Sequence, residues 1–138
     1  ERFSRKIARA IGETRRRRKI TRTKELVDIV REVKSRRVKE RIHPATRIFQ
    51  ALRMAVNDEL QNITGALEAS LEIAEPGGKI AVISFHSLED RVIKNFFREK
   101  HREKVVKILT PKPIQSSKEE IKENPRARSA KLRVAEKI

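Results

Sequence analysis

The sequence predicts an α/β protein in which helices come first and a small sheet follows. Three observations support this prediction. Apolar residues recur at spacings of three and four through most of the first 74 residues, as on the buried face of amphipathic helices. The stretch IAVISF, residues 80–85, is a continuous apolar run directly after the turn signal EPGGK. Two shorter strand-like stretches, VVKIL and AKLRVAEKI, follow, each after a helical pattern.

The first third of the chain is expected to hold two short helices separated by a basic linker. The first helix covers about residues 2–11 and ends near Gly12. The run RRRRK, residues 15–19, is expected to be a linker, because adjacent cations repel one another. A second helix begins with a cap at Thr21 or Thr23 and presents an apolar face of Leu, Ile and Val.

The middle of the chain is expected to be one long helix. The basic stretch KSRRVKERIHP, residues 34–44, predicts a loop that ends at the break before Pro44. Apolar residues then continue at helical spacing to Ala74, and Pro44 fits the first turn of such a helix. Gly65 is expected to interrupt or bend it, since Gly costs about 1 kcal/mol inside a helix.

The last third predicts the order strand, helix, strand, short helix, strand. Residues 80–85 form a fully buried strand, followed by a helix of about residues 87–100 and a strand at 105–109. Ser117 begins a capping-box pattern for the short helix. The final stretch alternates only weakly, so we expect a strand at the edge of the sheet. This order looks like the closing half of a Rossmann-type sheet, which would be a poor independent sheet.

The chain of 138 residues is strongly basic, with a formal net charge of +16. Such a charge favours a polyanionic partner, nucleic acid first and an anionic membrane surface second. The excess is concentrated in residues 1–47, which hold eighteen Lys and Arg against six Asp and Glu. No apolar run approaches the roughly 20 residues that cross a bilayer, so we expect no membrane-spanning segment. Of the two candidates, nucleic acid and no membrane is the partner we expect. The absence of Cys excludes thiolate and disulfide sites and is compatible with a cytoplasmic location.

The stretch VISFHSLEDR changes abruptly from apolar to polar at the end of a predicted strand. Ser87, with Asp90 three residues later, fits a helix N-cap, and capping alone explains both residues. Capping requires neither Phe85 nor His86. These two residues lie at the carboxyl end of the strand, where open sheets bind ligands, so a substrate-facing role and a structural role are equally open.

The sequence predicts neither a metal site nor a phosphate-binding glycine loop. The chain has three His, and none lies four residues from another, as paired metal ligands on a helix would. Its four Gly include no G-x-G pattern, so no cradle for a cofactor phosphate is expected.

Two further groups of residues are candidates for contact with a nucleic acid. In the stretch HPATRIFQALRMAVNDEL, Arg47 and Asn57 lie away from the apolar face of the predicted helix. They belong either to a solvated surface or to a polar stripe that contacts a substrate or a second domain. The basic run RRRRK predicts sequence-independent attraction to phosphates, unless it is only a solvated loop. Its five cations are Arg15, Arg16, Arg17, Arg18 and Lys19.

Four stretches of the chain, in their order, resemble one family. They are ERFSRKIARAI, HPATRIFQALRMAVNDEL, PGGKIAVISFHSLEDRVIKNFF and NPRARSAKLRVAE. They resemble the ribosomal RNA small-subunit methyltransferase H family, the MraW-type enzymes that use S-adenosylmethionine to methylate the N4 amine of a cytidine in 16S rRNA. The resemblance implies the C-terminal part of a Rossmann-like methyltransferase sheet preceded by a mostly helical insert domain.

The chain departs from the family pattern in its cofactor motifs. The family's glycine-rich cofactor loop and its Asp-Leu-Gly-x-Ser-Ser segment are both absent, so the chain is expected to be a fragment that binds RNA but not S-adenosylmethionine. By this resemblance, residues 1–11 belong to the methyltransferase domain, 12–72 form the helical RNA-facing insert, and 73–138 return to the methyltransferase domain. Its partners would be 16S rRNA or the small ribosomal subunit, and the missing N-terminal half or a second copy.

The resemblance also implies roles for individual residues. Phe85, His86 and Ser87 would wall or contact the cytidine, with Arg47 and Asn57 facing the same cleft from the insert. The residue that accepts the amine proton is expected in the missing half. The alternative is a non-catalytic basic RNA-binding module derived from such an enzyme. An unrelated ribosome-associated helical protein would explain the charge but not the stretch PGGKIAVISFHSLEDR.

Overall fold

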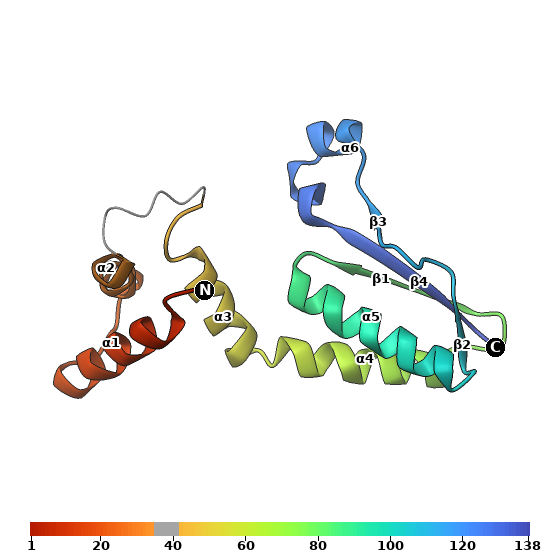
Figure 1. The fold of residues 1–138 in the computed structure, drawn as a ribbon, viewed down its shortest axis with the longest axis horizontal. Helices are drawn as coiled ribbons and strands as arrows, with labels where there is room; N and C mark the ends of the chain where they lie inside the picture. The colour runs from red at the N-terminus through yellow and green to blue at the C-terminus, as the bar shows by residue number, and fades with distance from the viewer. Residues whose placement is uncertain (35–41) are drawn as a thin grey trace. The chain divides into compact units, whose positions relative to one another are not determined.

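The computed structural model describes residues 1–34 and 42–138, which form two compact units (Figure 1). The first unit is Glu1–Asn57 and the second is Asp58–Ile138. The divisions expected after residues 11 and 72 fall inside helices. The assignment of those stretches to a methyltransferase domain and an insert therefore stays a prediction.

The first unit consists, within its described residues, of helices packed around a small core. The helices are α1 (Ser4–Arg17), α2 (Thr23–Lys34) and α3 (Thr46–Val56). The buried core side chains are Ile7, Val30, Ala45 and Ile48. Beside them the buried Lys34 ammonium lies 2.7 Å from the Glu1 carboxylate and donates to the Pro44 carbonyl at 2.7 Å, which offsets its desolvation. Of the loop expected at 34–44, Lys34 is still helical and residues 35–41 lie outside the described residues.

Helix α1 is longer than the sequence predicts. It continues through Gly12 to Arg17, so three arginines of the run RRRRK lie in its last turn. The prediction of a linker at 15–19 is wrong for these arginines. Cations are favourable at a helix C-terminus, because they interact with the partial negative charge of the unpaired carbonyls. The helix ends at Arg17, and its C-cap Arg18 has an extended backbone.

The long helix expected in the middle of the chain is two helices. α3 ends at Val56, and α4 (Glu59–Ile73) begins after Asp58. Asp58 has a left-handed backbone, with φ 49° and ψ 35°, which Asp adopts more readily than most residues. Gly65 lies inside α4, so the predicted interruption at Gly65 is wrong. Its cost of about 1 kcal/mol is smaller than the gain from burying two leucines of the same helix.

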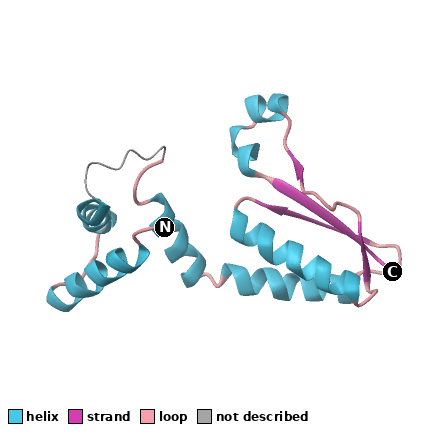
Figure 2. Cartoon of the chain, viewed as in Figure 1, coloured by secondary structure: helices cyan, strands magenta, loops and turns pink. Residues whose placement is uncertain are grey.

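The second unit contains a four-stranded sheet in which every paired strand is antiparallel (Figure 2). The strands are β1 (Lys79–Ser84), β2 (Val106–Ile108), β3 (Ile114–Gln115) and β4 (Lys131–Lys137). The order is β1-β4-β2, and β3 also pairs with β4. Ser84 lies opposite Lys131, and Val106 lies opposite Lys137. β4 is therefore central, and the prediction of an edge strand is wrong.

The two strands that flank β4 run in the same direction. β4 is antiparallel to both β1 and β2, so these two strands are parallel to each other. α5 (Ser87–Arg102) connects them, as a crossover helix does in an α/β unit. The carboxyl ends of β1 and β2 therefore lie at the same edge of the sheet. After β3, α6 (Lys118–Glu123) begins at the predicted cap Ser117, and a 3₁₀ helix (Pro125–Ser129) leads into β4.

The core of the second unit lies between one face of the sheet and helices α4 and α5 (Figure 2). Its buried members are Leu67, Leu71, Ile80, Ile93, Phe96, Phe97, Val106 and Ala135. β1 is buried on this face alone: Ile80 is buried, whereas Ile83 is 59% exposed. The prediction of a fully buried strand is therefore wrong for this chain, because the described helices cover one face of β1.

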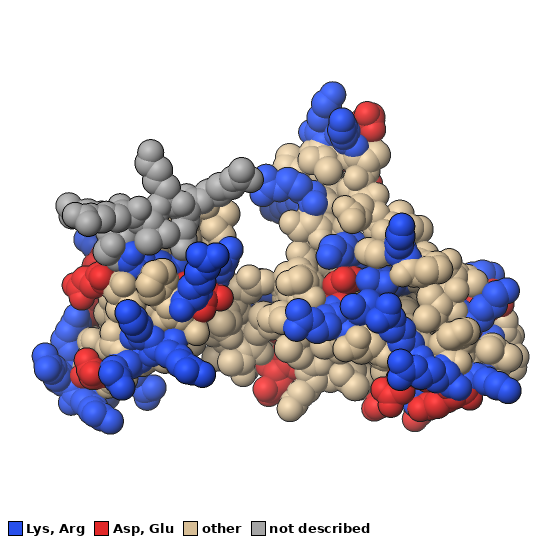
Figure 3. All heavy atoms as spheres, in the orientation of Figure 1, with Lys and Arg blue, Asp and Glu red and all other residues tan. Residues whose placement is uncertain are grey.

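Secondary structure of both types confirms the α/β class predicted from the sequence. Lys and Arg side chains are exposed on both units, as the net charge requires (Figure 3). Among the described residues, no helix combines the length and the apolar character that a bilayer crossing needs.

Candidate functional site

The exit of β1 places Phe85 at the surface of the second unit. β1 ends at Ser84 and α5 begins at Ser87, so two residues make the turn between them. Phe85 is 55% exposed. Its backbone N–H donates to Oε2 of Glu89 at 2.8 Å, which fixes the backbone of the turn. An aromatic ring held this way at the carboxyl edge of a sheet can contact a flat ligand.

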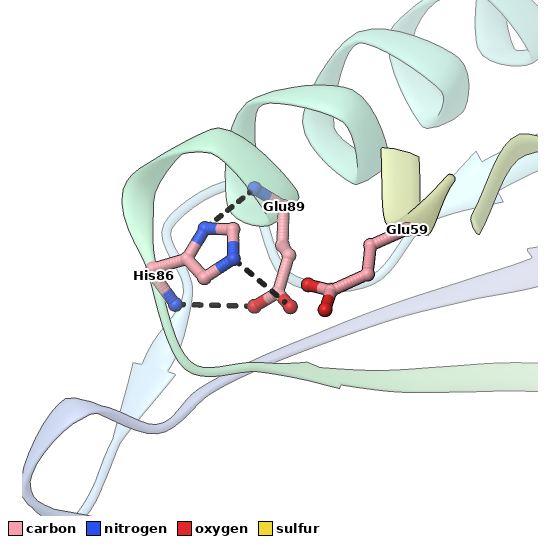
Figure 4. Close-up of side chains that lie close together, drawn as sticks. All are labelled: Glu59, His86 and Glu89. Carbon is pink, nitrogen blue, oxygen red and sulfur yellow. Dashed lines mark hydrogen bonds and ion pairs between the residues drawn. The ribbon is translucent and has the colours of Figure 1, made fainter. Parts of the chain in front are cut away.

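His86 is the N-cap of α5. Its backbone is extended, and its Nδ1 accepts a hydrogen bond from the backbone N–H of Glu89 at 3.3 Å. In return, Oε2 of Glu89 accepts from the backbone N–H of His86 at 3.2 Å, which completes a capping box (Figure 4). Backbone donors at the start of the helix are thereby satisfied, so His86 has a structural role whatever else it does.

The predicted cap at Ser87 with Asp90 is wrong. Ser87 is already the first helical residue, and the cap lies one position earlier. The sequence contains two overlapping patterns, Ser-x-x-Asp and His-x-x-Glu, and both have the spacing of a capping box. Ser is the more common cap type, so residue preference favoured the first pattern. The backbone geometry of the strand exit decides for the second pattern.

A third side chain, missed by the sequence analysis, joins this turn. Glu59, in the first turn of α4, lies beside His86 and Glu89, and one ligand-type atom of each lies within 4.8 Å of the others (Figure 4). Nε2 of His86 is buried and makes no hydrogen bond among the described residues, although Oε1 of Glu89 is 3.2 Å away. The His-x-x-Glu spacing could have identified Glu89. No local pattern could have identified Glu59, which is 27 positions from His86.

The capping hydrogen bond of His86 argues against metal binding at this cluster. A neutral imidazole carries one ring proton. Because Nδ1 accepts the capping hydrogen bond, the geometry assigns this proton to Nε2, which then offers no lone pair to a metal. Transfer of the proton to Nδ1 would set two N–H groups against each other and break the cap. The cluster therefore suits an N–H facing carboxylates better than a divalent cation.

Asp90 ties the start of α5 to the central strand. Its carboxylate accepts hydrogen bonds from Nε of Arg133 at 2.7 Å and from Nη2 at 3.3 Å, and Nζ of Lys131 is 3.6 Å away. Both members of the Asp90–Arg133 pair are largely buried. The hydrogen bonds from Arg133 keep the pKa of Asp90 below its usual value. Asp90 is therefore a structural anchor and not the capping partner that the sequence predicts.

The basic run lies at the end of α1 and in the turn after it. Arg15 and Lys19 line a shallow hollow of about 310 Å³ together with Ile20 and Thr21. Arg15 to Arg17 are exposed in the last turn of α1. These positions are compatible with contact to phosphate groups, and the predicted RNA contact stays a prediction.

Arg18 differs from its neighbours because it forms an ion pair with Glu25. The Glu25 carboxylate also accepts backbone hydrogen bonds from Thr21 at 2.9 Å and Arg22 at 3.0 Å. These backbone hydrogen bonds, and then the bond from Arg18, lower the pKa of Glu25 to about 2. Glu25 thus stays ionised and neutralises one cation of the run. Arg18 is therefore the least available of the five predicted phosphate contacts.

Arg47 and Asn57 belong to the first unit. Arg47 is exposed in the first turn of α3, and Asn57 is the C-cap of the same helix. The strand exit with Phe85 belongs to the second unit. The grouping of Arg47 and Asn57 with Phe85 around one cleft stays a prediction.

Comparison with known proteins gives one consistent result. The model of the MraW methylase family matches residues 1–138. A protein of Persephonella marina named ribosomal RNA small subunit methyltransferase H is 53% identical over 139 residues, and one of the same name from Rhodopirellula baltica is 54% identical over 139. Another from Heliobacterium modesticaldum is 49% identical over 154 residues.

These alignments cover all of this chain but only part of each relative. The covered shares of the three relatives are 47%, 42% and 49%. The chain therefore spans about half the length of the curated relatives it matches, in their C-terminal part.

Proposed function

Because this chain belongs to the MraW methylase family, we propose that it is part of an S-adenosylmethionine-dependent enzyme that methylates the N4 amine of a cytidine in 16S rRNA. The names of the relatives support methyl transfer to RNA of the small ribosomal subunit. The cytidine amine and the cofactor come from the family resemblance of the four sequence stretches. A non-catalytic RNA-binding module is not favoured, since relatives with 53% and 54% identity are named as methyltransferases.

The second unit would form the closing part of a Rossmann-like sheet. Its support is the parallel direction of β1 and β2, which flank β4 and are connected by the crossover helix α5. Among the described residues, β1 pairs only with β4, so its other edge could pair with a strand from the rest of the protein. The helical stretch at residues 12–72 would be the RNA-facing insert. The same edge, unpaired among the described residues, would also allow self-association of the isolated chain.

The residues of this chain do not fit a site for S-adenosylmethionine. Gly12 and Gly65 lie inside helices, and Gly77 and Gly78 precede β1 in a turn where Gly77 has φ 82°. The turn that does lead from a strand into a helix contains Phe85 and His86 instead of glycines. The cofactor would therefore be held by the other half of the enzyme, and calorimetry should detect no cofactor binding to this chain alone.

The contribution of this chain would be to hold the base. The N4 lone pair of cytosine is delocalised into the ring, so the amine is a weak nucleophile that must be oriented accurately. Enzymes that act on a base also remove it from its stack and hold it against aromatic or apolar side chains. The observation that carries the proposal is the exposed Phe85 ring, whose backbone Glu89 fixes at the carboxyl edge of the sheet. His86 and Ser87 would support this wall of the pocket, with His86 acting mainly as the cap.

The first unit would supply attraction to the RNA backbone. Arg15, Arg16 and Arg17 are exposed in the last turn of α1, and Lys19 follows them. Such cations attract phosphate groups without reading the sequence. The partner would be 16S rRNA, free or in the small subunit, which implies a cytoplasmic enzyme.

Substitution of Phe85 in the complete enzyme tests the proposal. With small subunits and a methyl-labelled cofactor, Phe85→Ala should lower the methylation rate about 5- to 150-fold, because base stacking on an aromatic ring contributes about 1–3 kcal/mol. Phe85→Tyr keeps the ring and should retain most activity. Ile114→Ala is the matched control, since Ile114 is also 55% exposed in the same unit. Normal turnover of the Phe85→Ala enzyme would place the base elsewhere.

A further inference from the structure

We propose that a hollow beside α5 and β2 in the second unit is a binding site for a phosphate group of the RNA backbone. This inference rests on the proposed function, which makes RNA the partner, and it adds a contact outside the basic run of the first unit. The hollow has a volume of about 290 Å³. It is lined by Lys94, Phe97, Arg98, His101, Ile108, Thr110, Pro111 and Arg133. The lining includes no acidic side chain.

Two cations of the hollow are not neutralised. Lys94 and Arg98 are four residues apart on α5, so they lie one above the other on the same face of the helix. Among the described residues, neither has a carboxylate within 4.0 Å. Lys100, by contrast, lies on the same helix and pairs with Glu103 at 2.7 Å. Lys94 and Arg98 therefore keep their charge available for an anion.

Arg133 adds a guanidinium whose position is already fixed. Its Nε and Nη2 donate to the Asp90 carboxylate. This carboxylate offsets the charge of the guanidinium and fixes its orientation, so Arg133 adds an oriented donor to the hollow more than it adds net charge. Within the described part of the chain, the side-chain hydrogen bonds of Arg133 involve Nε and Nη2, and this largely buried residue lines the hollow. A guanidinium held by a carboxylate on one side loses little conformational entropy when it binds an anion on the other.

The floor and the rim of the hollow favour anion binding in different ways. Phe97, Ile108 and Pro111 are apolar, and such a floor strengthens attraction between charges above it. On the rim, Nδ1 of His101 lies 2.9 Å from the carbonyl of Val106, which fixes the imidazole ring. Thr110 is engaged elsewhere, because its Oγ1 accepts from the backbone N–H of Val134 at 2.8 Å. The binding chemistry is therefore carried by the cations.

RNA is favoured over other anions by charge and surroundings. Figure 3 shows many Lys and Arg side chains on one face of the second unit, with acidic side chains gathered along its lower edge, so a polyanion could extend over the basic part of this face. With a net charge of +16, the chain attracts a polymer of phosphates more strongly than a single small anion. An acidic peptide is the competing occupant, and the experiment includes it.

The test measures RNA binding by the 138-residue chain at several salt concentrations. With a short fluorescent single-stranded RNA, the double variant Lys94→Gln, Arg98→Gln should bind about tenfold more weakly. The slope of log affinity against log salt should fall by roughly 1–2, as expected when two phosphate contacts are lost. The swapped variant Lys94→Arg, Arg98→Lys keeps both charges and should keep the slope. Thermal unfolding of each variant checks that the fold is intact.

The matched control removes the same charge at the same spacing elsewhere. Lys118 and Lys122 are exposed, four residues apart on α6. The double variant Lys118→Gln, Lys122→Gln should leave the affinity and the slope nearly unchanged. A drop equal to that of the α5 variant would show a general charge effect and would overturn the site. Competition by poly-glutamate but not by RNA would overturn it in favour of an acidic peptide.

The outcomes separate this site from the proposed function. Unchanged affinity and slope in the α5 double variant would overturn the hollow while leaving RNA as the partner. Absence of RNA binding by the unsubstituted chain would overturn the hollow as an RNA site. The proposed function is tested separately, by methylation with the complete enzyme carrying Phe85→Ala.

Discussion

The imidazole of His86 accepts a hydrogen bond from the backbone N–H of Glu89 at 3.3 Å, and the Glu89 carboxylate accepts one from the backbone N–H of His86 at 3.2 Å. This reciprocal pair begins α5 directly beside the exposed ring of Phe85. The cap of α5 therefore also supports Phe85, the residue proposed to contact the base. Substitutions here change stability and activity in different proportions, and that difference can be measured.

Replacement of the cap should change stability at His86 and not at Ser87. His86→Ala removes the acceptor for the Glu89 N–H and should lower the free energy of unfolding by about 0.5–2 kcal/mol. His86→Asn restores a good cap and should recover most of that loss. Ser87→Ala should change stability by less than about 0.5 kcal/mol. Urea unfolding measures all three, and a larger loss at Ser87 than at His86 would contradict the capping geometry.

Acid should selectively remove the contribution of the Asp90–Arg133 pair. The pKa of Asp90 lies below its usual value in the folded chain, so the pair stabilises above about pH 4 and is lost as the pH falls through the folded-state pKa. Asp90→Asn should therefore cost roughly 2 kcal/mol at pH 7. The cost should shrink toward zero in strong acid.

Urea unfolding at neutral and acidic pH measures this dependence. Glu72→Gln, at an exposed position of α4, is the control and should change stability little at either pH. A pH-independent cost at Asp90 would show that the carboxylate charge does not contribute.

The basic run should contribute unequally to RNA binding. Replacing Arg15, Arg16 and Arg17 by Gln preserves the helix and should reduce the salt slope by about 2–3, with similar weakening for different RNA sequences. Arg18→Gln should have a smaller effect per residue, because Arg18 is paired with Glu25. Fluorescence anisotropy against salt gives the slopes. An unchanged slope in the triple variant would remove the end of α1 from the RNA interface.

The left-handed backbone of Asp58 should restrict substitution there. Asp58→Val should cost about 1–2 kcal/mol, because a β-branched side chain clashes in this conformation. Asp58→Gly should be neutral or slightly stabilising. Gln61→Val, at an exposed position in the first turn of α4, should cost less than about 0.7 kcal/mol. Equal costs for the two valines would show that the break is not fixed at Asp58.

The sequence alone determined the features that depend on neighbouring residues. Helical spacing predicted helices in both units, and the Ser-x-x-Glu pattern predicted the cap at Ser117. Apolar runs separated by a helical pattern predicted the order β1, α5 and β2. It also identified the family, because long stretches such as HPATRIFQALRMAVNDEL are specific. These properties depend on local backbone preferences and on the order of residues, and the sequence contains all the information that both require.

Only the tertiary structure decided the features that depend on distant residues. β4 is central because it pairs with three strands. The alternation of apolar and polar residues within β4 does not show how many strands pair with it. Arg133 meets Asp90 across 43 positions, and Glu59 meets His86 across 27. The local sequence also allows a helix that continues through Asp58 and a cap at Ser87 instead of His86. In both cases the surrounding structure selects one of several local states that differ by about 1 kcal/mol or less.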